Sequence, residues 1–104
     1  MPIPEILDAV ILKNGDFVNG KVLTKYFNLK TSYGEIKVKR EDIAHIHMKG
    51  TQFAKDEILM IELNKFSGIL EEKVIEVKLK NGQKIKIKTN KIHTIMMLTN
   101  RTSK

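Results

Sequence analysis

Regularly spaced lysines are the residues of this 104-residue chain whose type and spacing could do chemistry. They alternate with apolar residues near the end of the chain, and a shorter alternating run occurs in the first half. A β-strand with this alternation puts its lysines on one face, where their ammonium groups could follow a phosphate backbone. The same pattern is typical of a solvated sheet face on which lysine prevents aggregation. The two sets are Lys78, Lys80, Lys84, Lys86, Lys88 and Lys91, and Lys30, Lys37, Lys39 and Arg40.

The overall charge leaves the same two interpretations open. The formal net charge is +7 and the sequence pI is near 9.7. A basic protein attracts polyanions because binding releases the counterions condensed on them. A lysine-rich composition can also serve solubility alone. We therefore expect a polyanionic partner and keep solubility as the alternative.

Histidine and carboxylate pairs are the candidates for metal or acid–base sites. His45 and His47 are two positions apart and share one face of an expected strand, which would make half of a metal site. A convergent third ligand is missing from the pattern, so we expect surface or interface histidines, no metal and no cofactor. The carboxylate pairs Glu41-Asp42 and Glu71-Glu72 flank expected turns and balance nearby lysines.

Several classes of protein are excluded by what the sequence lacks. There is no cysteine, so disulfides and thiolate metal sites are absent. No nucleophile motif, phosphate-binding loop or dinucleotide fingerprint occurs, and we expect no enzyme activity. The chain has no apolar run of the roughly 18 residues that a membrane helix needs, and no basic leader before an apolar stretch. We expect a cytoplasmic protein that does not bind membranes.

The elements that would carry these residues are almost all strands. Alternating apolar residues predict strands over 10–13, 17–25, 27–32, 35–39 and 43–48. Asn14-Gly15 and Tyr33-Gly34 predict tight turns between them, and 40–42 reads as one helical turn. Gly20 lies inside an expected strand, which indicates a bend or a close approach of another backbone segment. A short N-terminal helical turn is expected over 4–7.

The strand pattern of the first half recurs in the second half, which indicates two repeats of about 48 residues. The alignment places Gly20 on Gly68, and one extra residue then enters the turn near Gly82. The strand that opens the second pass is expected over 57–63, and Lys65-Phe66-Ser67 is taken to replace the turn Asn14-Gly15-Asp16. We interpret 1–104 as a single domain, with repeat one at 9–48, a connector at 49–56, repeat two at 57–98 and a frayed tail at 99–104. A weak signal predicts one helical turn near 52–55.

The first repeat resembles the Sm/LSm family of small, strongly bent β-barrels. The first Sm motif joins an apolar strand, a glycine turn, a glycine in the bent second strand, and an Asn before an apolar residue. The second motif is Arg-Gly-x-x-Ile followed by x-x-Ile. The matching residues are Leu12, Gly15, Val18, Gly20 and Asn28-Leu29 for the first motif, and Lys39, Arg40, Ile43 and Ile46 for the second.

This resemblance implies an antiparallel β-barrel that binds RNA. Base binding in the family uses an aromatic residue, an Asn and a cation, which correspond here to Tyr26, Asn28 and Lys39. Arg40, Lys37, Lys30, Lys86 and Lys88 would hold phosphates. Two positions differ from the family pattern: the acid four positions before the Asn is Thr24, and the glycine of the second motif is Arg40.

The resemblance also implies assembly, since Sm-like proteins form rings by pairing edge strands. The run 92–98 is apolar on both faces, so it must be covered by the other repeat or by another chain. We expect an RNA-binding, oligomeric scaffold or chaperone that self-associates through edge strands. The alternatives are a structural or assembly module that binds no nucleic acid, and a self-contained two-repeat monomer.

Overall fold

One continuous antiparallel β-sheet makes up the architecture of the chain. The computed structural model describes residues 7–49 and 55–99. These residues form ten strands and two single-turn 3₁₀ segments, without an α-helix. The elements are β1 (Asp8–Leu12), β2 (Phe17–Val22), β3 (Tyr26–Thr31), β4 (Gly34–Lys39), η1 (Arg40–Asp42), β5 (Ile43–His47), β6 (Asp56–Met60), β7 (Lys65–Leu70), β8 (Val74–Leu79), β9 (Lys84–Lys88), η2 (Thr89–Lys91) and β10 (Ile92–Met96).

The order of strands across the sheet has a symmetry of its own. It runs β4-β3-β7-β6-β5-β10-β1-β2-β8-β9. Strands at equal distances from the two edges correspond to each other, and their numbers always differ by five. The corresponding pairs are β4 and β9, β3 and β8, β7 and β2, β6 and β1, and β5 and β10. We call β4-β3-β7-β6-β5 the β5 half and β10-β1-β2-β8-β9 the β10 half. Each half therefore combines two strands from one part of the chain with three from the other.

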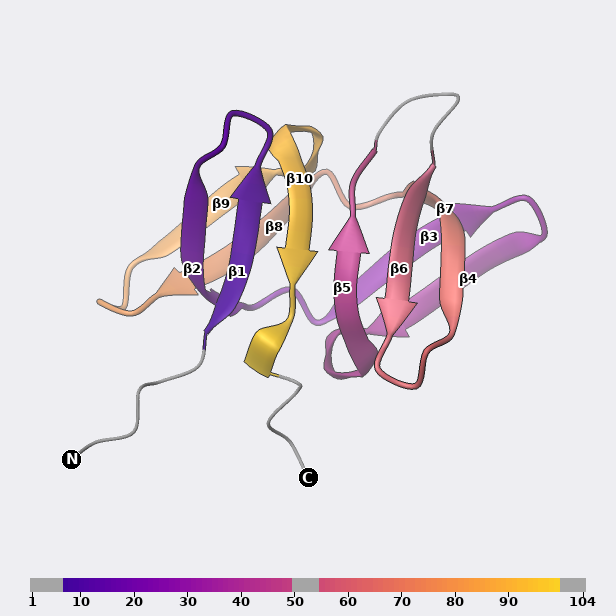
Figure 1. The fold of residues 1–104 in the computed structure, drawn as a ribbon, viewed down its shortest axis with the longest axis horizontal. Coiled ribbons are helices and arrows are strands. Elements are labelled where there is room, and N and C mark those ends of the chain that lie inside the picture. Colours follow the sequence, from indigo (N-terminus) through magenta and orange to yellow (C-terminus); the bar gives the residue numbers. More distant parts are fainter. Residues whose placement is uncertain (1–6, 50–54, 100–104) are drawn as a thin grey trace.

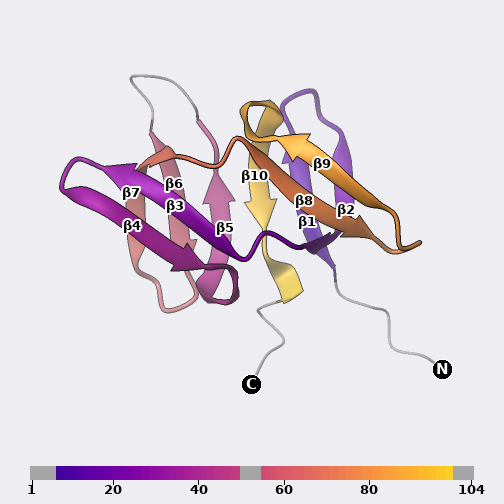
Figure 2. The ribbon, with the colours of Figure 1, turned by 180° about the vertical axis from the view of Figure 1, so that it is seen from behind.

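The two halves are joined side by side through β5 and β10. In each half one hairpin lies behind the other three strands. Figure 1 shows β2, β1, β10, β5, β6 and β7 as the front layer, with the hairpins β8–β9 and β3–β4 behind it at opposite ends. Seen from behind in Figure 2, both hairpins lie on the near side of the molecule. The sheet is thus a curled half-barrel, and the whole measures 49 × 32 × 19 Å.

Apolar residues at alternate positions fill the inside of the curl. Phe27 and Leu29 of β3 are fully buried, as are Ile75 and Val77 of β8, while their strand neighbours point outward. Burying an aliphatic or phenyl side chain stabilises a fold by roughly 1.5–3 kcal/mol. The remaining fully buried large side chains come from the front layer: Val10, Val22, Ile43, Ile46, Ile58, Ile92, Ile95 and Met97.

The turn between β1 and β2 has glycine at its left-handed position, as expected, whereas the turn between β6 and β7 has leucine there. Gly15 adopts φ 95° between β1 and β2, as the Asn14-Gly15 signal predicts. The turn between β6 and β7 instead has Leu63 at φ 77°, a left-handed conformation that is unusual for a branched apolar residue. The predicted turn at Lys65-Phe66-Ser67 is wrong, since these residues begin β7. The actual turn lies at Leu63, the position that the repeat alignment places on Gly15.

Two glycines mark the places where the curl is tightest. A Cβ atom on Gly20 would lie 2.5 Å from the backbone oxygen of Lys78, and one on Gly68 would meet the backbone oxygen of Lys30. Gly20 in β2 pairs with β8, and Gly68 in β7 lies against β3. The predicted close backbone approach at Gly20 is confirmed, and its reason is the crossing of a hairpin from the other part of the chain.

Several expectations can now be compared with the fold. The all-β class and the single turn at Arg40–Asp42 are confirmed. A closed barrel is not formed, because β4 and β9 are left as the two edges of the sheet. The apolar run at Ile92–Met96 is covered within the chain by β1 and β5, so it is not an outer edge.

Some expectations cannot be compared in this way. The helical turns predicted over 4–7 and 52–55 and the tail from 100 lie outside the described residues, apart from Leu7 and Lys55. Within the described ranges, no helix is long and apolar enough to cross a membrane.

Candidate nucleic-acid interface

Tyr26 and two lysines form a cluster on the outward face of the β3–β4 hairpin. Tyr26 is directly opposite Lys39 in the strand register, and Asn28 is opposite Lys37. The ammonium of Lys37 lies 4.4 Å from the centre of the Tyr26 ring, which is a cation–π distance. Tyr26 remains 44% exposed. The predicted residues Tyr26, Asn28 and Lys39 are therefore neighbours, and the ring is accessible from solvent.

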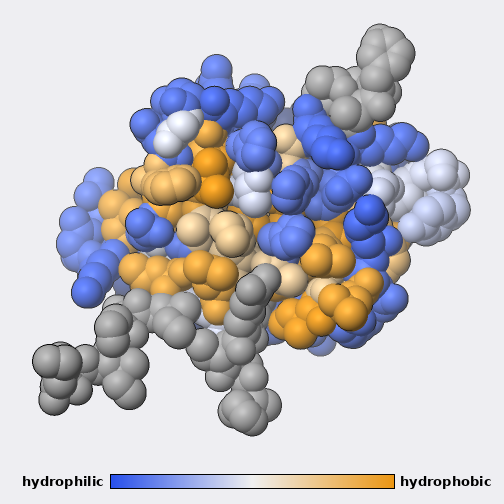
Figure 3. All heavy atoms as spheres, in the orientation of Figure 1, coloured by the Kyte–Doolittle hydropathy of each residue, from blue (hydrophilic) through white to orange (hydrophobic). Residues whose placement is uncertain are grey.

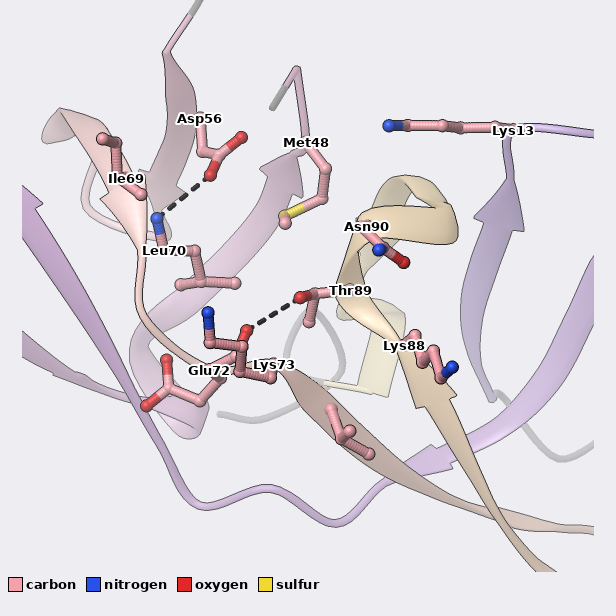
Figure 4. A pocket seen from close by; sticks show the side chains of 11 residues that line it. Lys13, Met48, Asp56, Ile69, Leu70, Glu72, Lys73, Lys88, Thr89 and Asn90 are labelled. Atoms are coloured by element: carbon pink, nitrogen blue, oxygen red, sulfur yellow. Dashed lines mark hydrogen bonds between the residues drawn. The ribbon is translucent and has the colours of Figure 1, made fainter. Parts of the chain in front are cut away.

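Asn28 is oriented by a residue that the sequence analysis did not assign to the site. The Nδ2 of Asn28 donates a hydrogen bond to Glu72 Oε2 at 2.7 Å, and its backbone N–H donates to Glu72 Oε1 at 2.8 Å. Glu72 lies in the link between β7 and β8, while Asn28 lies on β3. One carboxylate thus fixes both the backbone and the amide of Asn28. Figure 4 shows this carboxylate pointing away from Thr89.

A signal that could have found Glu72 was present in the sequence. The alignment of the two repeats places Thr24 on Glu72, and Thr24 occupies the position of the acid that the resemblance requires. In the β10 half the backbone N–H of Glu76 donates to Thr24 Oγ1 at 3.1 Å. Thr24 therefore binds the β8–β9 hairpin. The acid that binds Asn28 is Glu72, the residue that the alignment pairs with Thr24.

Arg40 lies apart from the exposed cluster. Its Nη2 donates to Asp8 Oδ2 at 2.6 Å and to Thr99 Oγ1 at 2.8 Å. The side chain of Arg40 is 11% exposed and that of Asp8 is fully buried. The carboxylate of Asp8 also accepts hydrogen bonds from the backbone N–H groups of Val22 and Thr99. Arg40 therefore ties the start of β1 to the end of the described chain.

The remaining predicted lysines lie on the outward faces of the two hairpins. Lys30, Lys37 and Lys39 are exposed on β3–β4, and Lys86 and Lys88 are exposed on β9. Both hairpins occupy the same side of the molecule, as Figure 2 shows. The other lysines of the set that contains Lys86 and Lys88 are also exposed, and they are Lys78, Lys80, Lys84 and Lys91.

The two hairpins differ at the positions that match the cluster. Opposite Lys88 stands Val74 in place of Tyr26, and opposite Lys86 stands Glu76 in place of Asn28. The β8–β9 hairpin therefore offers lysines without an aromatic ring or an amide. Beside Tyr26, a cavity of about 330 Å³ is lined by Lys25, Tyr26, Lys39, Glu41 and Asp42.

The histidines gather on the front layer and do not form a metal site. The ring centres of His45 and His47 are 5.1 Å apart, and those of His47 and His93 are 6.1 Å apart. Within 7–49 and 55–99, no group of three or more His, Asp or Glu side chains is arranged to hold a metal ion. Sequence reasoning paired His45 with His47 and did not connect His93 to them.

The front face, away from the hairpins, mixes charged and apolar side chains (Figure 3). The turn between β6 and β7 carries two exposed apolar residues, Ile61 and Leu63. Leu63 is 79% exposed.

Comparison with known proteins identifies no relative. No protein-family model matches the chain, and neither a curated protein nor a solved structure matches it significantly. The function must therefore be argued from the geometry.

Proposed function

We propose that the protein binds single-stranded nucleic acid, RNA in particular, on the outward face of the β3–β4 hairpin. The observation that carries this proposal is the cluster of an exposed Tyr26 ring, an oriented Asn28 amide and the adjacent Lys37 and Lys39. Single-stranded RNA is recognised by stacking bases on aromatic rings and by hydrogen bonds to base edges. In this function Tyr26 stacks on a base, Asn28 reads its edge and Lys39 lies over the ring of the base.

The hydrogen bond to Glu72 leaves Asn28 able to form hydrogen bonds with a base edge. Glu72 accepts one hydrogen of the amide, which leaves Oδ1 and the second amide hydrogen as an acceptor and a donor for a ligand. Because the amide cannot rotate without breaking this bond, its acceptor and donor are presented in one orientation. Such an arrangement lowers the entropy cost of binding.

The architecture behind this site is proposed to be two copies of one Sm-like unit that exchange strands. Matched hydrogen bonds support the duplication: Asp8 accepts from the backbone of Val22, and Asp56, its counterpart in the second repeat, accepts from that of Leu70. The closely approached Gly20 and Gly68 also match. Under this proposal the pair of Glu72 and Asn28 restores the acid–Asn pair of the family from two copies.

Phosphates would be held by lysines that surround the base site. Lys30, Lys37 and Lys39 lie on the same hairpin as Tyr26, and Lys86 and Lys88 lie on the other hairpin of the same side. A strand that crossed from one hairpin to the other would meet positive charge at both ends. Arg40 is left out of this role because its guanidinium is bound to Asp8.

Self-association would use the two edges of the sheet, β4 and β9. Their backbone groups on the outer side have no strand partner in the described chain. Both edges carry lysines, which oppose direct pairing of two copies until the charge is neutralised. A polyanion bound along these lysines would remove that opposition. We therefore propose an oligomeric scaffold whose assembly is favoured by nucleic acid.

The proposal is tested by titrating labelled oligo-U and oligo-A at two ionic strengths. Binding should weaken steeply with salt, because lysine–phosphate contacts release counterions. Tyr26→Ala should weaken base-dependent binding by about tenfold, since stacking on one aromatic ring contributes roughly 1–3 kcal/mol. Tyr33→Ala is the matched control, because Tyr33 is exposed on the β3–β4 turn. Absence of binding to both oligomers at low salt would refute the proposal.

A second candidate function is an assembly module that binds no nucleic acid. The observation in its favour is the pair of open edges β4 and β9. Light scattering separates the two: a mass above 12.0 kDa without any nucleic acid supports the assembly module. A 12.0 kDa species that grows only on addition of oligo-U supports the scaffold.

A further inference from the structure

Three lysines from three neighbouring strands stand in one row on the outward face of the β10 half. Lys21 of β2 is directly opposite Lys78 of β8 in the strand register, and Lys78 is directly opposite Lys84 of β9. All three residues are exposed. Directly opposite residues of an antiparallel pair have Cβ atoms about 4.5–5.5 Å apart and lie on one face. We call Lys21, Lys78 and Lys84 the lysine row.

The lysine row passes around the outside of the curl. Figure 1 shows β2 in the front layer and the β8–β9 hairpin behind it. Because β2 pairs with β8, the row continues from the front layer onto the hairpin without a gap in the sheet. A ligand that touched all three lysines would therefore run across the strands and not along them.

The positive charge of the lysine row is not balanced by neighbouring acids. Like charges directly opposite each other destabilise a sheet. None of the ion pairs found among residues 7–49 and 55–99 includes a member of the row. Glu76 lies on the same face of β8, but it is directly opposite Lys86. The row therefore lowers the stability of the free protein.

The corresponding row of the β5 half has a different composition. There the strands β7, β3 and β4 carry Ile69, Lys30 and Glu35 at the matching positions. Lys30 thus has an acid on one side and an apolar residue on the other. Because the same place in the fold accepts these residues, the fold itself does not require three lysines there. The lysine row is a separate property of the β10 half.

The surroundings of the lysine row favour a chain of phosphates as its partner. The next residues on the same face, two positions along the strands, include Asn19, Glu76 and Lys86, which are all polar. Protein interfaces instead have aromatic and apolar residues at their centres and are depleted in lysine. Lysine binds phosphate as a compact point charge. Cations repeated across three strands match an anion that is itself repeated.

We propose that the lysine row binds a linear chain of phosphates and reads no bases. The chain runs across β2, β8 and β9, and its charge removes the repulsion between the three ammonium groups. This surface goes beyond the proposed RNA interface, because none of its three lysines belongs to that interface and no step requires Tyr26. The backbone of a nucleic acid and inorganic polyphosphate share the required chemistry.

The two sources of such a chain are compared by titrating inorganic polyphosphate and an abasic deoxyoligonucleotide with the same number of phosphates. We expect binding that weakens steeply with salt. Tighter binding of the abasic oligomer would assign the row to a nucleic-acid backbone, and tighter binding of polyphosphate would assign it to the inorganic chain. Absence of binding for both at low ionic strength would overturn the proposal.

Two variants of equal charge at matching positions locate the surface. Lys78→Glu reverses the charge at the centre of the lysine row, and Lys30→Glu makes the same change in the β5 half. We expect Lys78→Glu to weaken binding of the phosphate chain by about tenfold or more, since charge-assisted contacts are lost. Lys30→Glu should change it by less than about threefold, as for a distant charge. Equal losses would indicate attraction by net charge alone and overturn the proposal.

Thermal denaturation without ligand gives a second measurement with opposite signs for the two variants. Lys78→Glu places an acid between two lysines and should raise the midpoint at low salt, whereas Lys30→Glu places it opposite Glu35 and should lower the midpoint. Polyphosphate should raise the midpoint of the unmodified protein more than that of Lys78→Glu. A lower midpoint for Lys78→Glu without ligand would contradict the unbalanced charge on which the proposal rests.

A failure here is distinguishable from a failure of the RNA proposal. Tyr26→Ala should weaken oligo-U binding and leave the affinity for polyphosphate and the abasic oligomer unchanged. If Tyr26→Ala abolished binding of both base-free chains, these would be assigned to the Tyr26 cluster and the separate surface on β2, β8 and β9 would be refuted.

Discussion

Asn28 and Glu72 are 44 residues apart in the chain and are joined by two hydrogen bonds of 2.8 and 2.7 Å. One bond holds the backbone of β3 and the other holds the amide of Asn28. The pair exists because the β3–β4 hairpin packs against β7 and not against β2. The orientation of the proposed base-reading group therefore depends on a strand contact between distant parts of the chain.

Removing this carboxylate should affect both stability and binding. Glu72→Ala leaves the partly buried backbone N–H and amide of Asn28 without their acceptor, and should lower the free energy of unfolding by about 1–3 kcal/mol. Urea denaturation measures the loss. Glu71→Ala is the control, because the neighbouring Glu71 side chain is exposed. In the proposed function Glu72→Ala also weakens oligo-U binding, and a wild-type affinity would show that the orientation of Asn28 has no role.

The buried ion pair of Arg40 with Asp8 should matter for stability alone. Arg40→Met leaves the fully buried Asp8 without its cation, and should cost about 3–5 kcal/mol in the free energy of unfolding. Lys39→Met provides the exposed neighbour as a control. A small loss for Arg40→Met, equal to that of the control, would contradict a structural role for the pair.

Leu63 offers a substitution that should stabilise the fold. Leu63→Gly relieves the left-handed backbone at φ 77° and removes a side chain that is 79% exposed, so little packing is lost. We expect the free energy of unfolding to rise by about 1 kcal/mol, the usual cost of a non-glycine residue in this conformation. The converse change, Gly15→Ala at the matching turn, should lower it. Thermal denaturation of both variants checks the prediction, and a destabilised Leu63→Gly would refute it.

The salt dependence of RNA affinity should report which cations contact phosphate. Replacing Lys30, Lys37 and Lys39 together by Ala should reduce the slope of log affinity against log salt by about 2, since each phosphate contact on a single strand contributes roughly 0.7. Arg40→Lys, which keeps the buried charge, should leave the slope unchanged. A slope that does not respond to the three lysines would remove the β3–β4 hairpin from the phosphate path.

Local features of the fold follow directly from the sequence. Alternating apolar residues predict the strands, Asn14-Gly15 and Tyr33-Gly34 predict turns, and the single turn at 40–42 occurs as expected. These features depend on side-chain periodicity and on backbone conformations that only a few residue types favour. Where the residue type was misleading, as at Leu63, the left-handed residue closes the local hairpin between β6 and β7, with the backbone N–H of Leu63 bonded to Met60.

The long-range partners of the strands were decided by the tertiary structure alone. By its pattern β2 could pair with β3, which follows it, yet β2 pairs with β8 and β7 pairs with β3. The hydrogen-bonding groups of the backbone are the same in every strand, and the hairpins β3–β4 and β8–β9 present similar apolar faces, so the sequence does not distinguish between these pairings. Gly20 indicated that some backbone would come close, and only the folded chain shows that it belongs to Lys78. For the same physical reason, the sequence placed Tyr26, Asn28 and Lys39 together on one hairpin, but Glu72 joined them only through the long-range pairing of β3 with β7.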